Sequence, residues 1–456
     1  MLWQFFSLLE GFENLLWSYI GFPVLMLLGL YLSYKSRFVQ IRKFPTVVKT
    51  FINFLKVRET CPGAVHPMQA FFACIGGCIG IGNIVGICTA VQVGGPGALF
   101  WIWMTALLGS MVKYSEVFLG LKFRVSNGQG GYSGGPMYFL KRVFKTSWMP
   151  TFVCLLLCVY GVEVYQFSVV TKSITSNLPV NQYVVIFVLL ALVIFAGSGG
   201  VKRVGSISSA IIPLFVVIYV GMGGWVLFNN LAVLPDVLKS VFNTAFTGHG
   251  ALGGFIGSTL LMTISQGVRR GCYTGDLGIG YASVIHSESS AKIPEKQAAL
   301  VIFDIFLDTF IICTSSVLVI LVTDVWHQPI ETGLLVQTAL SLYFPYMQFF
   351  MPFFLFLLGY STINAYFCVG LTCAEHLSPR FGRRIYYVYS ALALLIFSFV
   401  DTMQAQTVMS VAGGLLLTLN CYGIYKLKGE LSYNIEHAIE PKEPVEILPV
   451  LETAAG

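Results

Sequence analysis

Residues 71–91 read FFACIGGCIGIGNIVGICTAV, an apolar run in which glycines surround a single amide side chain: Gly76, Gly77, Gly80, Gly82 and Gly86 around Asn83. Glycine costs about 1 kcal/mol relative to alanine in a helix interior. Repeated glycine lets a membrane helix pack closely against a neighbour, or lets it unwind locally. We predict an unwound segment at Gly80–Asn83, with close packing as the alternative.

A second stretch repeats this pattern. Residues 267–283 read GVRRGCYTGDLGIGYAS, with five glycines around Asp276. If the first membrane span is set apart, the two stretches begin two halves of five spans each. Interrupted helices in matching positions of two halves point to a transport site at the membrane mid-plane. Free carbonyls there can ligate a cation, and a helix N-terminus offers N–H groups to a carboxylate, so the pattern favours amino-acid transport.

The composition is that of a membrane protein. Of 456 residues, 56% are hydrophobic and 11% are charged, and the mean hydropathy is +0.77, whereas a soluble domain carries roughly 25% charged residues. The apolar runs are continuous rather than alternating, which excludes a β-barrel. We read the net charge of +6 as loop residues that set orientation, so the expected partner is a lipid bilayer and not nucleic acid.

The runs long enough to cross a bilayer of ~30 Å number eleven. The predicted fold class is therefore an all-α integral membrane protein with eleven transmembrane helices, two of them broken. The predicted spans are 17–34, 68–93, 97–120, 151–175, 183–198, 207–228, 252–285, 299–323, 347–373, 385–400 and 404–425.

Basic residues are concentrated in alternate loops, which places the N-terminus outside and the C-terminus inside a bacterial inner membrane. We expect an interfacial helix within 325–346, a monomer, and reduced, buried cysteines. The predicted divisions are an N-terminal helix with a basic cytoplasmic loop, a first five-helix repeat, a second repeat with extracellular segments, and an acidic cytoplasmic tail: 1–66, 67–228, 229–425 and 426–456.

Polar residues inside the spans are candidates for function, because a charge at mid-membrane is costly and faces the bundle interior. Asn83 is expected to contact substrate or ion, or else to bond a neighbouring helix. Glu163 and Gln166 lie three apart on one helical face; Glu163 would coordinate a cation, bind an amino group, carry a proton, or remain a neutral structural carboxyl. Asp276 would contact substrate, or pair with Arg269 or Arg270.

Other charged residues in the spans are not predicted to bind substrate. Lys113 and Glu116 are predicted to pair near the inner end of the third span. Asp304 and Asp308 lie four apart on one face of the eighth span, and no role for Asp308 follows. The histidines form no cluster that suggests a metal site, and no Walker motif is present.

Longer motifs resemble the alanine or glycine:cation symporter family, of the sodium:alanine symporter type. The resemblance extends from about residue 68 to 425, and four stretches carry it: GIGNIVGICTAVQVGGPGALFWIW (80–103), SGGPMYFL (133–140), GVRRG (267–271) and IFLDTFIICT (305–314). It implies a fold similar to the amino acid–polyamine–organocation type, with an extra N-terminal helix and a core of five-plus-five inverted repeats. It also implies sodium-coupled uptake of alanine or glycine, with no organic cofactor.

The resemblance further implies a site. Sodium would bind the hydroxyls of Ser361 and Thr362 and the carbonyls of Cys78 and Ile79. The substrate pocket would comprise residues of the two breaks and of the facing helices: Gly80, Gly82, Asn83, Glu163, Gln166, Thr274, Gly275, Asp276 and Tyr366. Several of these residues depart from the family pattern. Thr274-Gly275-Asp276 appears where the family has Ser-Asn-Glu, and Glu163 and Gln166 appear where members often have Asn-x-x-Gln. The family's Thr-Thr…Trp stretch appears here as Ser361, Thr362 and then Tyr366. The identity of the amino acid therefore stays open.

The chain leaves other functions to weigh. Proton coupling, motivated by Glu163, is the alternative within the transporter class. A non-transporting amino-acid sensor would also accommodate the altered pocket. A channel should have rings of charge along a pore, which are missing from the sequence. No HExxH motif or serine–histidine pair lies within the spans, so no enzyme is expected.

Overall fold

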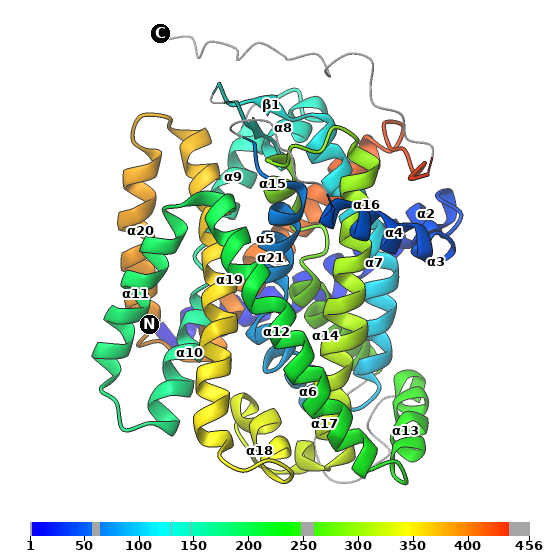
Figure 1. Cartoon of the computed structure of the whole chain (residues 1–456), viewed down its shortest axis with the longest axis vertical. Helices are drawn as coiled ribbons and strands as arrows, with labels where there is room; N and C mark the ends of the chain where they lie inside the picture. Colours follow the sequence, from blue (N-terminus) through cyan, green and yellow to red (C-terminus); the bar gives the residue numbers. More distant parts are fainter. Residues whose placement is uncertain (1, 57–63, 129, 147, 248–259, 437–456) are drawn as a thin grey trace.

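The computed structural model describes residues 2–56, 64–128, 130–146, 148–247 and 260–436. Helices make up nearly all of this part of the chain, and most run along the long axis of the molecule (Figure 1). One small antiparallel hairpin adds to the expected all-helical fold, with β1 (Val125–Ser126) paired to β2 (Tyr132–Ser133). It lies with α8 at one end of the bundle, and α18 lies at the other end (Figure 1).

The elements up to residue 229 are α1 Leu2–Leu15, η1 Leu16–Gly21, α2 Phe22–Lys35, α3 Val39–Arg42, α4 Phe44–Leu55, α5 Pro67–Cys78, η2 Ile81–Asn83, α6 Gly86–Gly94, α7 Ala98–Lys122, α8 Pro136–Phe139, η3 Leu140–Arg142, α9 Trp148–Tyr160, α10 Val164–Asn177, α11 Gln182–Gly197 and α12 Gly200–Asn229. The later elements are α13 Leu234–Thr247, α14 Leu260–Gly275, α15 Tyr281–Ser287, α16 Pro294–Ile305, η5 Phe306–Cys313, α17 Thr314–Val322, η6 Val325–His327, η7 Thr332–Leu334, α18 Leu335–Ser341, α19 Met347–Leu377, α20 Gly382–Phe397 and α21 Thr402–Lys426.

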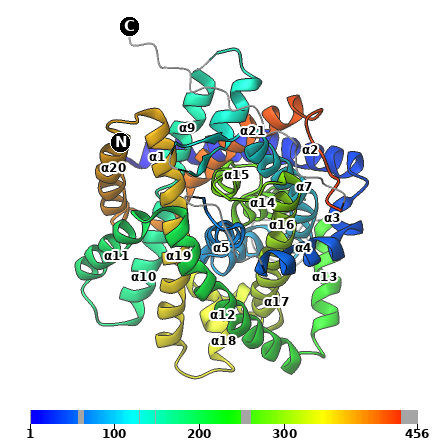
Figure 2. The ribbon, with the colours of Figure 1, turned by 45° about the horizontal axis from the view of Figure 1, so that its top comes forward.

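The helices surround a centre formed by α5, α14 and α15. Both views place α11 and α20 together on one flank, and α4 and α13 on the other side of the centre (Figures 1 and 2). The glycine-rich segments found in the sequence therefore lie inside the bundle, where other helices shield their peptide groups from lipid.

Among the described residues, six helical stretches are long and apolar enough to cross a membrane: Gln4–Lys35, Trp148–Asn177, Gly200–Asn229, Pro294–Val322, Met347–Leu377 and Thr402–Lys426. The pair Pro67–Cys78 and Ile81–Gly94, bent by 50°, would make a seventh span. The remaining predicted spans correspond to α7, α11, α14 with α15, and α20, which are shorter or more polar. Part of the predicted span 252–285, residues 252–259, lies outside the described residues.

The N-terminal region differs from its predicted form. The first span was expected at 17–34, but the helical stretch begins far earlier, with α1. Glu13 in this earlier part is buried, and its carboxylate accepts a bond from the Arg269 guanidinium at 2.9 Å. The expected loop within 1–66 also contains α4, whose Phe51 ring packs on Phe303 at 4.6 Å. Long-range partners, which the local sequence does not reveal, stabilise both helices.

The two glycine-rich helices run antiparallel and are joined at both ends. At one end the backbone of Val65, just before α5, bonds to Glu288 and Ser290, just after α15, at 3.2 and 2.8 Å. At the other end the Thr263 hydroxyl, at the start of α14, donates to the carbonyl of Gly94, the last residue of α6, at 2.7 Å. The start of each helix therefore lies beside the end of the other.

Other expectations have simpler outcomes. The region 325–346 contains the short helices η6, η7 and α18, as expected, although its place at a membrane surface is not tested. All ten cysteines in the described part of the chain are free and buried. Residues 426–436 fold back, since Glu430 contacts Lys122 and Glu436 contacts Lys43, and the rest of the predicted tail lies outside the described residues.

Candidate functional site

The first predicted break is present. Helix α5 ends at Cys78, Ile79 and Gly80 are extended, and the single turn η2 precedes α6. Asn83 closes this loop, because its side-chain oxygen accepts the Gly80 N–H at 3.0 Å. Gly80 must be glycine here, since a Cβ would lie 2.5 Å from the Thr362 hydroxyl oxygen and 2.8 Å from Oε1 of Gln166.

The second predicted break is also present. Helix α14 ends at Gly275, and α15 begins at Tyr281. Between them Asp276, Gly278 and Gly280 have φ angles of +49°, +74° and +111°. A non-glycine residue in the left-handed region costs roughly 1–2 kcal/mol, so the strain at Asp276 must be offset by its contacts. Its carboxylate accepts the Ala282 N–H at 3.2 Å and the hydroxyl of Tyr366 at 3.4 Å.

A third interruption was missed in the sequence. The predicted span 151–175 is divided into α9 and α10, and Glu163 between them has φ +51°. The Glu163 carboxylate is fully buried and accepts the Tyr273 hydroxyl at 3.1 Å. One turn later, Oε1 of Gln166 accepts the N–H of Ile81 in the first break at 3.3 Å. The available signal was Gly161 beside a buried carboxylate, but a single glycine did not distinguish a break from close packing.

The first and second breaks lie against one another. A Cβ on Gly82 would meet the Thr274 methyl group at 3.4 Å and the Tyr273 ring at 3.5 Å, which is ordinary contact distance. The Thr274 hydroxyl donates to the carbonyl of Arg270 in its own helix at 3.1 Å. The structure thus brings Gly82 and Thr274 together as predicted, but presents the methyl group rather than the hydroxyl to the first break.

The predicted sodium ligands gather only in part. Thr362 donates to the Gly76 carbonyl at 3.0 Å, and the Ser361 hydroxyl lies 2.8 Å from that of Ser208. The Thr362 hydroxyl therefore bonds the end of α5, and the Ser361 hydroxyl lies beside it, 2.7 Å from where a Cβ on Gly76 would be. Gly76 is close in sequence to Cys78 and Ile79, whose carbonyls are the other predicted ligands. Hard oxygen atoms of this kind fit sodium, so the residues present are compatible with the ion. Ser208 of α12 was not predicted and joins this group.

Asp308, to which no role was assigned from the sequence, belongs to the first break. Its carboxylate accepts bonds from the Asn83 amide and, at 2.9 Å, from the Thr309 hydroxyl. Asp308 and Thr309 lie in η5, a π-helical turn, which is a feature found frequently at functional sites. Asn83 thus bonds a neighbouring helix, which was one of its two expected roles, and connects its own loop to this carboxylate. Its contact with substrate or ion stays a prediction.

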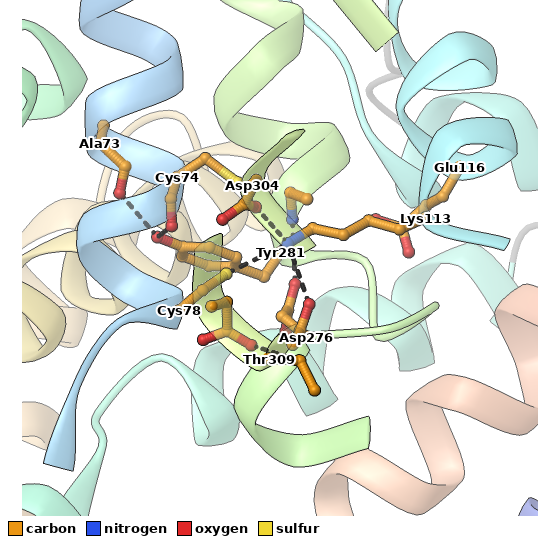
Figure 3. Close-up of polar contacts among 12 residues, drawn as sticks. Ala73, Cys74, Cys78, Lys113, Glu116, Asp276, Tyr281, Asp304 and Thr309 are labelled. Atoms are coloured by element: carbon orange, nitrogen blue, oxygen red, sulfur yellow. Dashed lines mark hydrogen bonds and ion pairs between the residues drawn. The ribbon is translucent and has the colours of Figure 1, made fainter. Parts of the chain in front are cut away.

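The structure contradicts the predicted Lys113–Glu116 pair and one of the two alternatives for Asp276, an ion pair with an arginine. The Lys113 ammonium bonds Asp304 at 2.6 Å, not Glu116, whose carboxylate accepts the Ser283 N–H at 3.2 Å (Figure 3). Arg269 pairs with Glu13 rather than with Asp276. In both cases the sequence neighbour was preferred over a partner from a distant helix.

Tyr366, predicted to line the pocket, stacks on Tyr281 with ring centroids 4.1 Å apart. The Tyr281 hydroxyl in turn donates to the carbonyl of Ala73 in α5 at 3.0 Å (Figure 3). The two rings therefore form one wall that connects α19, the second break and the first broken helix.

The interior of the described chain contains more acidic than basic groups. Six carboxyl groups are buried, on Glu13, Glu116, Glu163, Asp276, Asp304 and Asp308, against three lysine and arginine side chains, on Lys113, Arg269 and Arg270, and the imidazole of His286. Buried charges require partners. Protons or cations must therefore balance part of this excess.

A model of the sodium:alanine symporter family matches residues 3–439, almost the whole chain. The chain belongs to the sodium:alanine symporter family. It is thus a multi-pass membrane transporter, and the resemblance drawn from the motifs is confirmed.

Relatives of this family member include a sodium/alanine symporter of Methanococcus maripaludis, 28% identical over 91% of this chain and 95% of that protein. A probable sodium/glutamine symporter of Bacillus subtilis is 29% identical over 91% of this chain and 87% of its own length. An uncharacterized transporter of Haemophilus influenzae is 34% identical, with 72% of each chain covered.

Solved structures agree on the fold of this family member. A sodium-coupled sialic acid symporter superposes with a TM-score of 0.52, covering 91% of this chain and 86% of that one, at 11% identity. A nucleobase-cation-symport-1 family transporter gives 0.50 over 77% of each chain at 14% identity. At such identities the likeness concerns the fold alone.

Proposed function

We propose that the chain is a secondary active symporter that couples uptake of a small neutral amino acid, of the alanine or glycine kind, to sodium. The observation that carries the proposal is the meeting of two broken helices in a polar interior with an excess of carboxyl groups. The relative named as a sodium/alanine symporter supports a small neutral amino acid as substrate. The relative named as a probable sodium/glutamine symporter leaves the size of the substrate side chain open.

Each broken helix has a part in this proposal. The substrate carboxylate binds at the Gly80–Gly82 segment, where a helix start offers N–H donors and a positive dipole. There it replaces the side-chain oxygens of Asn83 and Gln166, which accept the Gly80 and Ile81 N–H groups in this structure. The substrate ammonium faces the carboxylates of Glu163 and Asp276. Sodium binds the hydroxyls of Ser361 and Thr362 with the Cys78 and Ile79 carbonyls.

The proposal includes the finer architecture. Eleven spans cross a bacterial inner membrane, with the N-terminus outside and the C-terminus cytoplasmic, and the protein works as a monomer. Residues 67–228 and 229–425 form inverted five-helix repeats. The antiparallel course of the two broken helices supports the inversion, as does the position of each break in the first proposed span of its half.

The test is uptake of radiolabelled alanine, glycine and glutamine into proteoliposomes that contain the purified protein. Accumulation should require a sodium gradient, and equal rates with sodium or choline outside would refute the proposed coupling. Thr362→Ala should raise the sodium concentration for half-maximal uptake at least several-fold. Thr418→Ala is the matched control, because the Thr418 hydroxyl bonds only the Gly414 carbonyl of its own helix in the described structure.

Proton coupling is the second candidate, and Glu163 favours it. This carboxyl is fully buried in the third interruption, and within the described structure it accepts a bond from a tyrosine hydroxyl rather than from a basic side chain. Uptake driven by a proton gradient without sodium, and lost in Glu163→Gln, would establish this alternative. Amino-acid binding without accumulation would instead identify a sensor.

A further inference from the structure

One ammonium group lies between the two broken helices. The Lys113 side chain of α7 reaches into the centre and bonds Asp304 of α16 at 2.6 Å, the Gly275 carbonyl at 2.9 Å and the Cys78 sulfur at 3.2 Å (Figure 3). An ammonium has three N–H donors, and these three contacts can use all of them. The Lys113 side chain is fully buried.

The surrounding atoms are of the kind that hold a free cation. The sulfur atoms of Cys74 and Cys78 and a carboxylate oxygen of Asp304 lie within 4.8 Å of one another. This is the one group in the described chain with such spacing among histidine, cysteine and acidic side chains. The Lys113 nitrogen lies at its edge, bonded to two of the three members.

The contact with Gly275 distinguishes Lys113 from a simple ion-pair partner. Gly275 is the last residue of α14, and the final carbonyls of a helix have no partner within it. Asp304 alone would balance the lysine charge. The additional bond places that charge on the carbonyl where the second broken helix stops, next to the strained Asp276.

We propose that the Lys113 ammonium is a resident cation of the transport site, that is, a positive charge that belongs to the protein itself. It bonds the Gly275 carbonyl at the end of the second broken helix. Without the lysine, a cation bound from solution would be required in its place. Shortening the side chain should then create a site for a small primary ammonium. This inference rests on the proposed function, because it concerns the same site.

The first experiment is chemical rescue of Lys113→Ala. Relative to alanine, lysine carries the atoms of n-propylammonium in addition, and 1-propanol is a neutral molecule of similar size. Alanine uptake should fall at least tenfold in Lys113→Ala and recover several-fold with millimolar propylammonium, but not with 1-propanol. Lys122→Ala is the matched control: it is in the same helix and pairs with Glu430 at the exposed end, so neither additive should change its uptake. A folded Lys113→Ala protein that transports normally, or that the amine does not restore, would overturn the proposal.

A second variant covers a failure of Lys113→Ala to fold. In Lys113→Met/Asp304→Asn both charges are removed, so no unpaired buried charge destabilises the protein. Its Tm should lie near that of the wild type, while uptake stays at least tenfold lower because the Gly275 carbonyl has lost its cation. Wild-type uptake by this double variant would show that Lys113 and Asp304 form only a structural pair, and would overturn the proposal.

Failure of the proposed function is recognised separately. If the wild-type protein shows no sodium-dependent uptake, the symport proposal fails. The resident cation is then tested by thermal unfolding alone, because propylammonium should still raise the Tm of Lys113→Ala and leave that of Lys122→Ala unchanged. No such rise would reject the inference as well.

Discussion

Gly80→Ala should impair transport without unfolding the protein. The added Cβ would lie 2.5 Å from the Thr362 hydroxyl oxygen and 2.8 Å from Oε1 of Gln166, well inside contact distance. Both neighbours are side-chain ends, so they can move, but each then loses its bond to the first broken helix, to the Gly76 carbonyl or the Ile81 N–H. Inserting a methyl group into a packed interior costs about 1–3 kcal/mol. If this cost falls on the substrate-bound state, affinity drops roughly 5- to 150-fold.

The assay is the apparent Kd for alanine from ligand-induced thermal stabilisation, together with proteoliposome uptake. Gly224→Ala is the matched control, because a Cβ on Gly224 in α12 would have no other atom within 4 Å. This control should bind normally and be slightly more stable, since alanine favours a helix interior by about 1 kcal/mol. Alanine affinity and uptake of Gly80→Ala within twofold of the wild type would refute the close approach deduced at this break.

Three further outcomes are expected. Gly278→Ala should destabilise the protein by roughly 1–2 kcal/mol, because φ is +74° there, and a lower Tm measures the loss. Arg269→Met should cost about 3–5 kcal/mol by leaving Glu13 buried and unpaired, and adding Glu13→Gln should recover most of the lost thermal stability. The bond from the Lys122 ammonium lowers the pKa of the Glu430 carboxyl in the folded protein. This exposed pair should therefore stabilise the protein at a pH above the unfolded-state pKa of Glu430, and the stabilisation should be lost as the pH falls through the lowered folded-state pKa. Thermal unfolding of Lys122→Met between pH 3 and 7 should show a small effect, under about 1 kcal/mol, that salt removes.

The sequence predicted the two breaks because its signal was local and repeated. Several glycines around one polar residue are costly in an ordinary helix, and the same pattern appeared at corresponding places in two halves. The third interruption carried no such excess. Glu163 adopts a left-handed conformation that tertiary contacts with Tyr273 must support, and no local rule anticipates such a contact.

Polar partners were the least predictable part of the site. Lys113 had an acidic residue three positions away, yet it bonds Asp304, 191 positions along the chain. Asn83 was located correctly at the break, but its bond to Asp308 depends on how η2 and η5 pack. A sequence indicates which groups must be buried, whereas the arrangement of helices decides which of them meet.

The bonds that join the two broken helices at both ends have a consequence for alternating access. To spread apart at one end, the pair would have to break its bonds near Val65 or near Gly94. We therefore expect this pair to move as one rigid unit, with the flanking helices sliding past it to open each side in turn. Spin labels in α5 and α15 should keep a constant separation through the cycle, while distances from α5 to α20 should change.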